Sequence, residues 1–187
     1  LTADRNRDYR SPEAIWASAI VENPRNDRAH YNLGNLNLDA RRHASAIASF
    51  ARSLAVKPDQ PKALGNLGNA LCRVGRYDEA LLRYDQALEA DPTYAIAANN
   101  KGNALKDLKR FAEAETSYRQ AIRIHPAYFN ARLNLGSLLL EQGNARAALP
   151  EFHECLKLRP GDRLAADQMS RAMEEVLRAQ GSENQNR

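Results

Sequence analysis

Residues 61–94 have the sequence PKALGNLGNALCRVGRYDEALLRYDQALEADPTY, and residues 95–128 follow with AIAANNKGNALKDLKRFAEAETSYRQAIRIHPAY. The two segments have the same length of 34 residues and carry glycine, alanine, an aromatic residue and proline at matching positions. The match continues on both sides of the pair. Self-similarity at a fixed period is the signature of a repeat architecture, so this period decides the fold.

Four columns of residues keep the period. The prolines are Pro24, Pro58, Pro92, Pro126 and Pro160, and the glycines are Gly34, Gly68, Gly102 and Gly136. The alanines are Ala46, Ala80, Ala114 and Ala148, and the aromatic residues are Trp16, Phe50, Tyr84, Tyr118 and Phe152. Proline cannot continue a helix, so we expect it to end the second helix of each unit. We expect glycine to let the two helices of a unit approach, alanine to lie opposite it, and the aromatic ring to fill the space between units.

These four columns resemble those of the tetratricopeptide repeat (TPR) over nearly the whole chain. The resemblance implies an all-α, right-handed solenoid of antiparallel helix pairs. We predict one TPR domain over residues 1–187, with a half-repeat at 9–26 and full repeats at 27–60, 61–94, 95–128 and 129–162. A capping helix is predicted at 163–179, where charged residues surround Leu164, Met169, Met173 and Val176, and a disordered tail at 180–187.

Composition excludes several classes of protein. Hydrophobic residues make up 43% and charged residues 27% of the chain, a balance typical of folded domains. The net charge of +4 is smaller than nucleic-acid binding requires. No apolar run approaches the roughly 20 residues of a membrane-spanning helix. The two cysteines, Cys72 and Cys155, lie in apolar helical pattern and are expected to be small core residues.

A polar stripe runs beside the predicted core stripe of each first helix. It contains an uninterrupted ladder of Asn32, Asn66, Asn100 and Asn134, and a second column of Asn35, Asn69 and Asn103. Asparagine costs roughly 0.6 kcal/mol against alanine inside a helix, so four at one repeat position call for an explanation. A carboxamide can bond both the C=O and the N–H of an extended peptide. We therefore predict a peptide-binding groove on the concave face.

The ladder is similar to the asparagine ladder of O-linked N-acetylglucosamine transferase, which implies that Asn32, Asn66, Asn100 and Asn134 grip substrate backbone. The alternative is that the asparagines were inherited by duplication or bond only to the adjacent helix. Four cations along the stripe, Arg28, Lys62, Arg73 and Lys106, favour an acidic ligand if they are not simply solvated. The carboxylate clamp of TPR chaperone adaptors needs a lysine one residue before the ladder position. That column holds Tyr31, Gly65, Asn99 and Leu133, so we do not expect this clamp.

No pattern of catalytic or cofactor-binding residues is found. His30, His43, His125 and His153 occupy unrelated repeat positions without a partner at metal-ligand spacing. The glycines are periodic and do not form a phosphate-binding loop. The aromatic residues that an RNA reader would use are committed to packing. We expect no enzyme, no cofactor, no metal and no nucleic-acid partner.

The first thirty residues carry a second resemblance. They contain Arg5, Asn6, Tyr9, Arg10, Ser11, Ile15 and Trp16, followed by Pro24, Asn26, Ala29, His30, Asn32, Leu33 and Gly34. This stretch is similar to the membrane junction of the transmembrane and TPR-containing mannosyltransferase-like proteins. The resemblance implies an extracytoplasmic TPR region tethered by a preceding membrane part, whereas without it a cytoplasmic location is expected. The start at Leu1 and the half-repeat at 9–26 agree with a segment of a longer chain.

Three functional hypotheses follow. The first is a protein-interaction scaffold that binds an extended peptide in its groove, and the second is a substrate-docking domain of a membrane glycosyltransferase-like protein. The third is a self-assembling scaffold, because the half-repeat leaves Trp16 poorly covered on one face.

Overall fold

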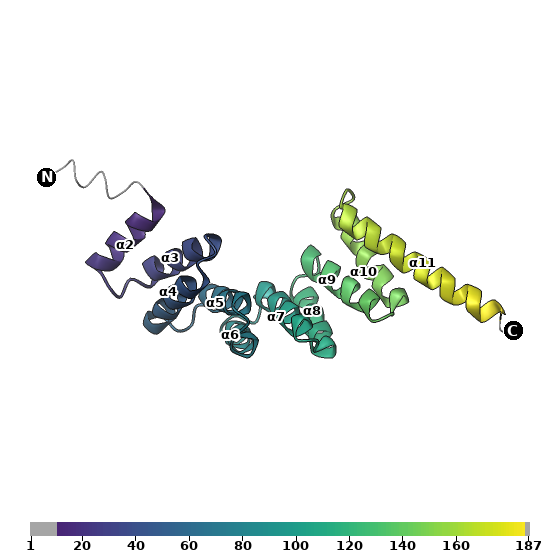
Figure 1. Cartoon of the computed structure of the whole chain (residues 1–187), viewed down its shortest axis with the longest axis horizontal. Coiled ribbons are helices and arrows are strands. Elements are labelled where there is room, and N and C mark those ends of the chain that lie inside the picture. Colours follow the sequence, from purple (N-terminus) through teal and green to yellow (C-terminus); the bar gives the residue numbers. More distant parts are fainter. Residues whose placement is uncertain (1–10, 186–187) are drawn as a thin grey trace. The chain divides into compact units, whose positions relative to one another are not determined.

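The computed structural model describes residues 11–185, with side chains from 11 to 181, and contains only helices in that range. The helices are α2 (Pro12–Glu22), α3 (Asp27–Asp39), α4 (His43–Val56), α5 (Pro61–Arg73), α6 (Tyr77–Ala90), α7 (Ala95–Asp107), α8 (Phe111–Ile124), α9 (Phe129–Glu141), α10 (Ala145–Leu158) and α11 (Arg163–Gln185). From α3 to α10 they form successive antiparallel pairs, the arrangement of a TPR solenoid (Figure 1). The predicted fold class is confirmed.

The chain forms two compact units, Leu1–Asn100 and Lys101–Arg187, whose boundary lies inside α7. In the first unit α2 packs on α3, α3 on α4, α4 on α5 and α5 on α6. In the second unit α8 packs on α9, α9 on α10 and α10 on α11. Each predicted repeat therefore holds one pair of helices, joined by a short turn.

Proline sets the end of every second helix. α2, α4, α6, α8 and α10 each end two residues before a proline of the column. Proline restricts the residue before it to extended geometry and has no N–H to donate, so the helix cannot pass this point. At the other ends, Ser11 Oγ accepts a hydrogen bond from Ala14 N at 3.1 Å and caps α2, and Asn26 Oδ1 accepts one from Ala29 N at 2.9 Å and caps α3.

The glycine column lies under the aromatic column of the same unit. A Cβ atom added at Gly34 would come within 2.6 Å of the Phe50 ring, and one at Gly102 within 2.5 Å of the Tyr118 ring. The rings of Phe50 and Tyr118 are fully buried. The aromatic side chain is therefore packed on glycine within its own helix pair. This corrects the expectation that alanine lies opposite glycine and that the ring fills the space between units.

A second backbone requirement recurs at the turn inside each pair. The same repeat position has a positive φ in all four full repeats, at Arg41 (57°), Gly75 (77°), Lys109 (61°) and Gly143 (74°). Left-handed geometry at a helix C-terminus favours glycine, because a side chain at this φ meets the following carbonyl. Two of the four repeats thus hold a long side chain in a conformation that glycine adopts without strain.

Helix α11 is longer than predicted. It extends to Gln185, so the expected disordered tail is wrong for residues 180–185. The helix passes the predicted end because no glycine with positive φ and no proline interrupts it: Gly181 stays in helical geometry.

Residues 186–187 lie outside the described part, as do Arg5, Asn6, Tyr9 and Arg10 of the N-terminal resemblance and the start of the predicted half-repeat. Across the described residues, no helix is both long and apolar enough to cross a membrane.

Candidate peptide-binding surface

The predicted ladder lies on the first helices of the repeats. Asn32, Asn66 and Asn100 stand on α3, α5 and α7 in the first unit, and Asn134 stands on α9 in the second. All four side chains are partly exposed. The side chains of these amides therefore reach solvent while their backbones remain part of regular helix.

Each of three ladder asparagines donates to the second asparagine column of the preceding repeat. In the first unit, Asn66 Nδ2 donates to Asn35 Oδ1 at 2.8 Å, and Asn100 Nδ2 donates to Asn69 Oδ1 at 3.0 Å. In the second unit, Asn134 Nδ2 donates to Asn103 Oδ1 at 3.0 Å. The two columns are thus joined into pairs that link consecutive first helices.

Tyrosine hydroxyl groups orient two of these pairs. Tyr84 Oη donates to Asn69 Oδ1 at 2.8 Å, and Tyr118 Oη donates to Asn103 Oδ1 at 2.9 Å. The carbonyl oxygens of Asn69 and Asn103 therefore each accept two hydrogen bonds, one for each lone pair. Flipping either amide would bring its Nδ2 against the Nδ2 of the ladder asparagine, so Oδ1 faces the two donors and Nδ2 points away from them.

Both tyrosines are buried aromatic-column residues whose hydroxyl groups remain protonated. Burial raises the pKa of Tyr84, and the adjacent Cys72 thiol raises it further. Burial also raises the pKa of Tyr118, together with the negative charges of Asp107 and Glu141. A hydroxyl that keeps its proton is a permanent donor, which fixes the asparagine orientation over the whole physiological pH range.

The first rung differs from the others. Phe50 occupies the aromatic position of its repeat and has no hydroxyl, and Asn66 Nδ2 instead lies 3.5 Å from Tyr31 Oη. Within residues 11–181 the Asn32 side chain has no hydrogen bond, whereas Asn100 Oδ1 accepts one from Asn99 Nδ2 at 3.1 Å. Asn32 is thus the ladder residue with no hydrogen bond to a neighbouring helix.

The predicted cations are distributed unequally. Arg28, Lys62 and Arg73 are exposed on α3 and α5 in the first unit. Lys106 in the second unit forms an ion pair with Glu141, with Nζ and Oε2 3.1 Å apart. Surface ion pairs of this kind contribute at most about 1 kcal/mol to stability. The pair nevertheless neutralises the positive charge of Lys106, which we had expected to favour an acidic ligand.

Sequence analysis missed the tyrosines as groups that orient the amides. The usable signal is an offset of 31 residues between Asn35 and Asn66, repeated between Asn69 and Asn100. This offset marks residues that face each other across consecutive first helices. Tyrosine rather than phenylalanine at positions 84 and 118 is the second part of the signal.

In the part of the chain that has described side chains, no group of three or more His, Cys, Asp or Glu residues could hold a metal ion. His30 is buried in the first turn of α3, with Nε2 2.9 Å from the carbonyl oxygen of Pro24 in the preceding loop. Arg132 occupies the same repeat position in the fourth full repeat, and its Nε donates to the Pro126 carbonyl at 2.8 Å. The two side chains hold equivalent turns.

Three family models match the chain, each described as "Tetratricopeptide repeat". They cover residues 26–93, 66–129 and 105–172. No curated protein sequence matches.

Solved structures with the same fold support the match. The chain resembles the type IV pilus biogenesis factor PilW with 26% identity and a TM-score of 0.75, over 95% of this chain and 87% of that one. It resembles MamA with 19% identity and a TM-score of 0.75, over 84% of this chain and 92% of that one, a likeness in fold alone. The first TPR of Spaghetti (RPAP3), "bound to HSP90 peptide SRMEEVD", is 25% identical with a TM-score of 0.60, over 63% of this chain and 93% of that one.

The repeat period, the helix pairs, the three family matches and the similar structures all agree, and the chain belongs to the tetratricopeptide-repeat family.

Proposed function

We propose that this chain is a protein-interaction scaffold that binds an extended peptide along the first-helix face through its paired asparagines. The observation that carries the proposal is the pairing itself. Asn35–Asn66 and Asn69–Asn100 in the first unit, and Asn103–Asn134 in the second, leave polar groups of defined orientation at the surface. The TPR of Spaghetti with its bound peptide is a precedent for a ligand of this class.

The pairing predicts which peptide group each column meets. Asn69 has used both lone pairs of Oδ1, so its Nδ2–H groups are suited to a peptide carbonyl. Asn66 has used one N–H on Asn35, and its Oδ1 is suited to a peptide N–H. An extended chain offers N–H and C=O groups at about 3.3 Å per residue, and first helices packed about 8–10 Å apart would meet it at about every third residue.

The same hydrogen bonds also support the alternative, in which the asparagines serve only to join consecutive helices. Asn32 separates the two hypotheses because it makes no hydrogen bond to another described residue. Its replacement by alanine removes a ligand contact and leaves the inter-repeat bonds in place.

The test compares Asn32→Ala, the combined Asn66→Ala/Asn100→Ala variant and the wild type on an unbiased library of extended peptides. Arg146→Ala is the matched control, since Arg146 is exposed on the second helix α10. If the asparagines bind peptide, Asn32→Ala loses captured peptides without a fall in the free energy of unfolding, and the control does not lose them. Retention of the same peptides by Asn32→Ala, or no capture by any variant, would refute the proposal.

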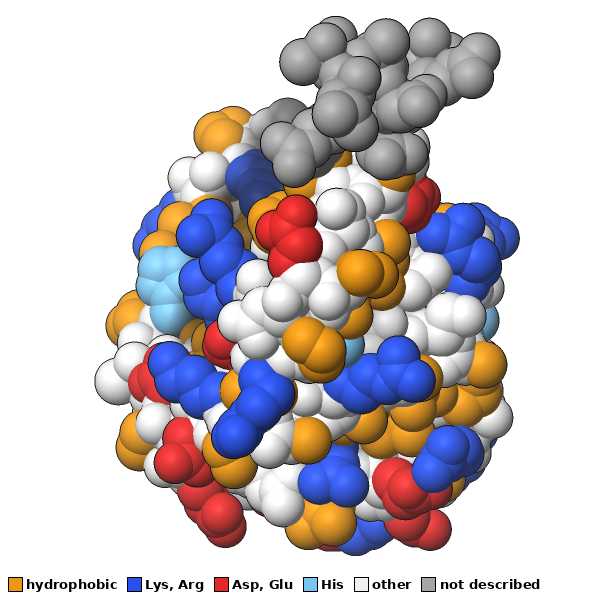
Figure 2. Space-filling model, turned by 90° about the vertical axis from the view of Figure 1, so that its left-hand side faces the viewer, with side chains coloured by type: hydrophobic (Ala, Val, Ile, Leu, Met, Phe, Trp, Pro, Cys, Tyr) orange, Lys and Arg blue, Asp and Glu red, His pale blue; other side chains and the backbone are white. Residues whose placement is uncertain are grey.

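Two further hypotheses keep the scaffold role. A substrate-docking domain of a membrane glycosyltransferase-like protein would use the same surface, and it rests on the resemblance within the first thirty residues. Self-association is favoured by exposed hydrophobic side chains near the chain ends: Val21 is 82% and Leu177 64% exposed. Figure 2 shows hydrophobic side chains interspersed with lysine and arginine on the face it presents. A sedimentation coefficient independent of concentration would dismiss self-association.

A further inference from the structure

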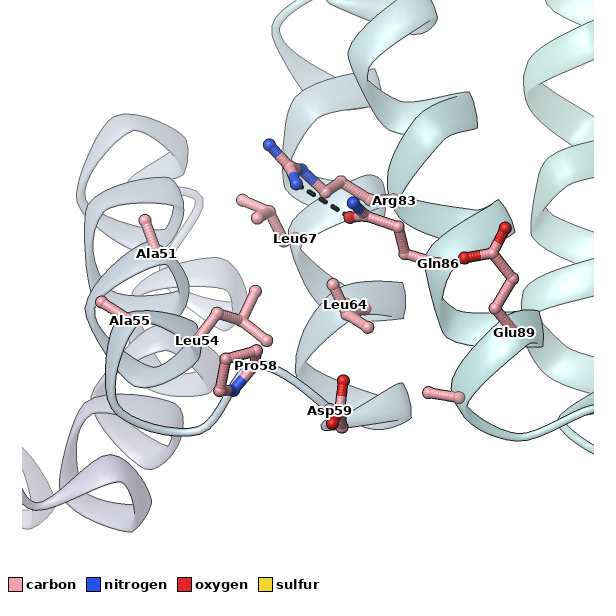
Figure 3. A pocket seen from close by; sticks show the side chains of 11 residues that line it. Ala51, Leu54, Ala55, Pro58, Asp59, Leu64, Leu67, Arg83, Gln86 and Glu89 are labelled. Carbon is pink, nitrogen blue, oxygen red and sulfur yellow. Dashed lines mark hydrogen bonds between the residues drawn. The ribbon is translucent and has the colours of Figure 1, made fainter.

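A cavity of about 770 Å³ lies between the second helices α4 and α6 of the first unit, away from the asparagine columns. Leu54 reaches it from α4, and Leu64 and Leu67 reach it from α5 (Figure 3). Its volume falls within the range of sites that bind drug-sized ligands. The cavity is therefore a second candidate site in the unit.

The cavity is open because two alanines of α4 and the long side chain of Arg83 on α6 line it from opposite helices. Ala51 and Ala55 line it from α4, where the equivalent positions of the later repeats are occupied by larger side chains. Those side chains are Asp85, Arg119 and His153 for Ala51, and Glu89, Arg123 and Lys157 for Ala55. Two alanines thus leave open the space that longer side chains occupy at the same positions elsewhere.

Arg83 supplies the positive charge of the site. The same repeat position holds Ser49, Ser117 and Glu151 in the other full repeats, so arginine at this position is specific to the second repeat. Its Nη1 donates to Gln86 Oε1 at 2.8 Å, while its Nε is buried without a hydrogen-bond partner among the described residues. Glu79, one turn earlier, is held by two hydrogen bonds from Arg76. A buried N–H without an acceptor is destabilising, so this guanidinium favours an anionic ligand at the cavity.

Opposite charge lies at the other end of the cavity. Asp59 and Arg83 stand at opposite ends of the row formed by Leu64 and Leu67 (Figure 3). Glu89 follows Arg83 by six residues on α6, a rise of about 9 Å. An extended peptide covers about 10 Å in three residues. The cavity is therefore complementary to a segment that carries an acidic and a basic side chain three residues apart, with leucine between them.

We propose that this cavity is a second peptide site, which takes an acidic–apolar–apolar–basic segment with its carboxylate on Arg83 and its cation near Asp59 and Glu89. The site is independent of the asparagine surface. A partner could then engage both helix sets of the first unit.

The test titrates the isotope-labelled full chain with the blocked peptide acetyl-Ala-Glu-Leu-Leu-Lys-Ala-amide and follows amide chemical shifts. The control peptide carries Gln in place of both Glu and Lys. We expect shifts centred on Ala51, Ala55 and Arg83, and at least tenfold weaker binding of the control peptide. Shifts confined to α3, α5 and α7, or none, would overturn the proposal.

Variants sharpen the result. Ala55→Leu fills the cavity from an exposed position and should lower affinity more than tenfold, and Ala51→Leu serves the same purpose if the first variant does not fold. Arg83→Glu should lower affinity at least tenfold, whereas Arg123→Glu, an exposed arginine of α8, should not. Equal losses in Arg83→Glu and Arg123→Glu would reduce the effect to net charge and refute the site. Unchanged affinity in the asparagine variants keeps this site distinct from the proposed groove. A dimer that sedimentation detects in the wild type but not in Ala55→Leu would place a second copy in the cavity and would also overturn the proposal.

Discussion

Asn100 Nδ2 donates a 3.0 Å hydrogen bond to Asn69 Oδ1, an oxygen that also accepts the hydroxyl proton of Tyr84 at 2.8 Å. A buried aromatic side chain of one helix pair thereby orients an amide, and this amide positions the asparagine of the next repeat. The chain Tyr84–Asn69–Asn100 couples packing inside a repeat to the polar surface between repeats. Networks of this kind are measured by double-mutant cycles.

The first prediction concerns that coupling. Tyr84→Phe and Asn69→Ala should each lower the free energy of unfolding by about 1 kcal/mol, because each leaves a polar group without its partner. The double variant should lose less than the sum, with a coupling of about 1 kcal/mol. Urea denaturation of the four proteins measures it, and strictly additive losses would show that the 2.8 Å contact carries no net energy.

The second prediction concerns the glycine column. Gly102→Ala places Cβ 2.5 Å from the Tyr118 ring, so the ring or the helices must move. We expect the free energy of unfolding to fall by about 1–3 kcal/mol, despite the higher helix propensity of alanine. Gly181→Ala is the control, since Gly181 lies in α11 with no atom within 4 Å of the added Cβ. It should be neutral or raise stability by up to about 1 kcal/mol, and a similar loss in both variants would contradict the packing argument.

The third prediction uses the positive φ at the turns. Arg41→Gly should raise the free energy of unfolding by about 0.5–1 kcal/mol, because φ is 57° at Arg41 and glycine adopts it without a steric penalty. Gly75→Ala, at the equivalent position with φ of 77°, should lower it by about 1 kcal/mol. Thermal denaturation tests the opposite signs, and a loss of stability in Arg41→Gly would contradict the prediction.

The fourth prediction concerns alkaline pH. Burial raises the pKa of the Cys155 thiol to about 11, from a reference value of 9.0. The folded pKa is the higher one, so the contribution to stability is complete below pH 9 and is lost as the pH rises toward 11. Its size is on the order of 2–3 kcal/mol.

Cys155→Ala isolates this contribution. The wild type should lose more of its free energy of unfolding between pH 9 and pH 11 than the variant does, while the tyrosines with raised pKa contribute equally to both. Parallel curves for wild type and variant would exclude a thiol contribution. In the wild type at pH 8, iodoacetamide should modify partly exposed Cys72 before buried Cys155.

The sequence by itself determined the elements that depend on local chemistry. Proline at positions 24, 58, 92, 126 and 160 ends the second helices, because its ring and missing N–H act on the adjacent residues whatever the rest of the chain does. The glycine and aromatic columns, with the 34-residue period, determined the family and the helix pairing in the same way. The missed end of α11 is also local: no residue near position 179 stops the helix.

Only the tertiary structure decided which side chains meet. Asn69 and Asn100 are 31 residues apart, and the sequence could place them on one face without revealing that they bond to each other. The packing of Phe50 on Gly34 within a pair, and the cavity between Ala51 and Arg83, depend on how closely two helices approach. That distance results from the summed packing of many side chains, and no single segment encodes it.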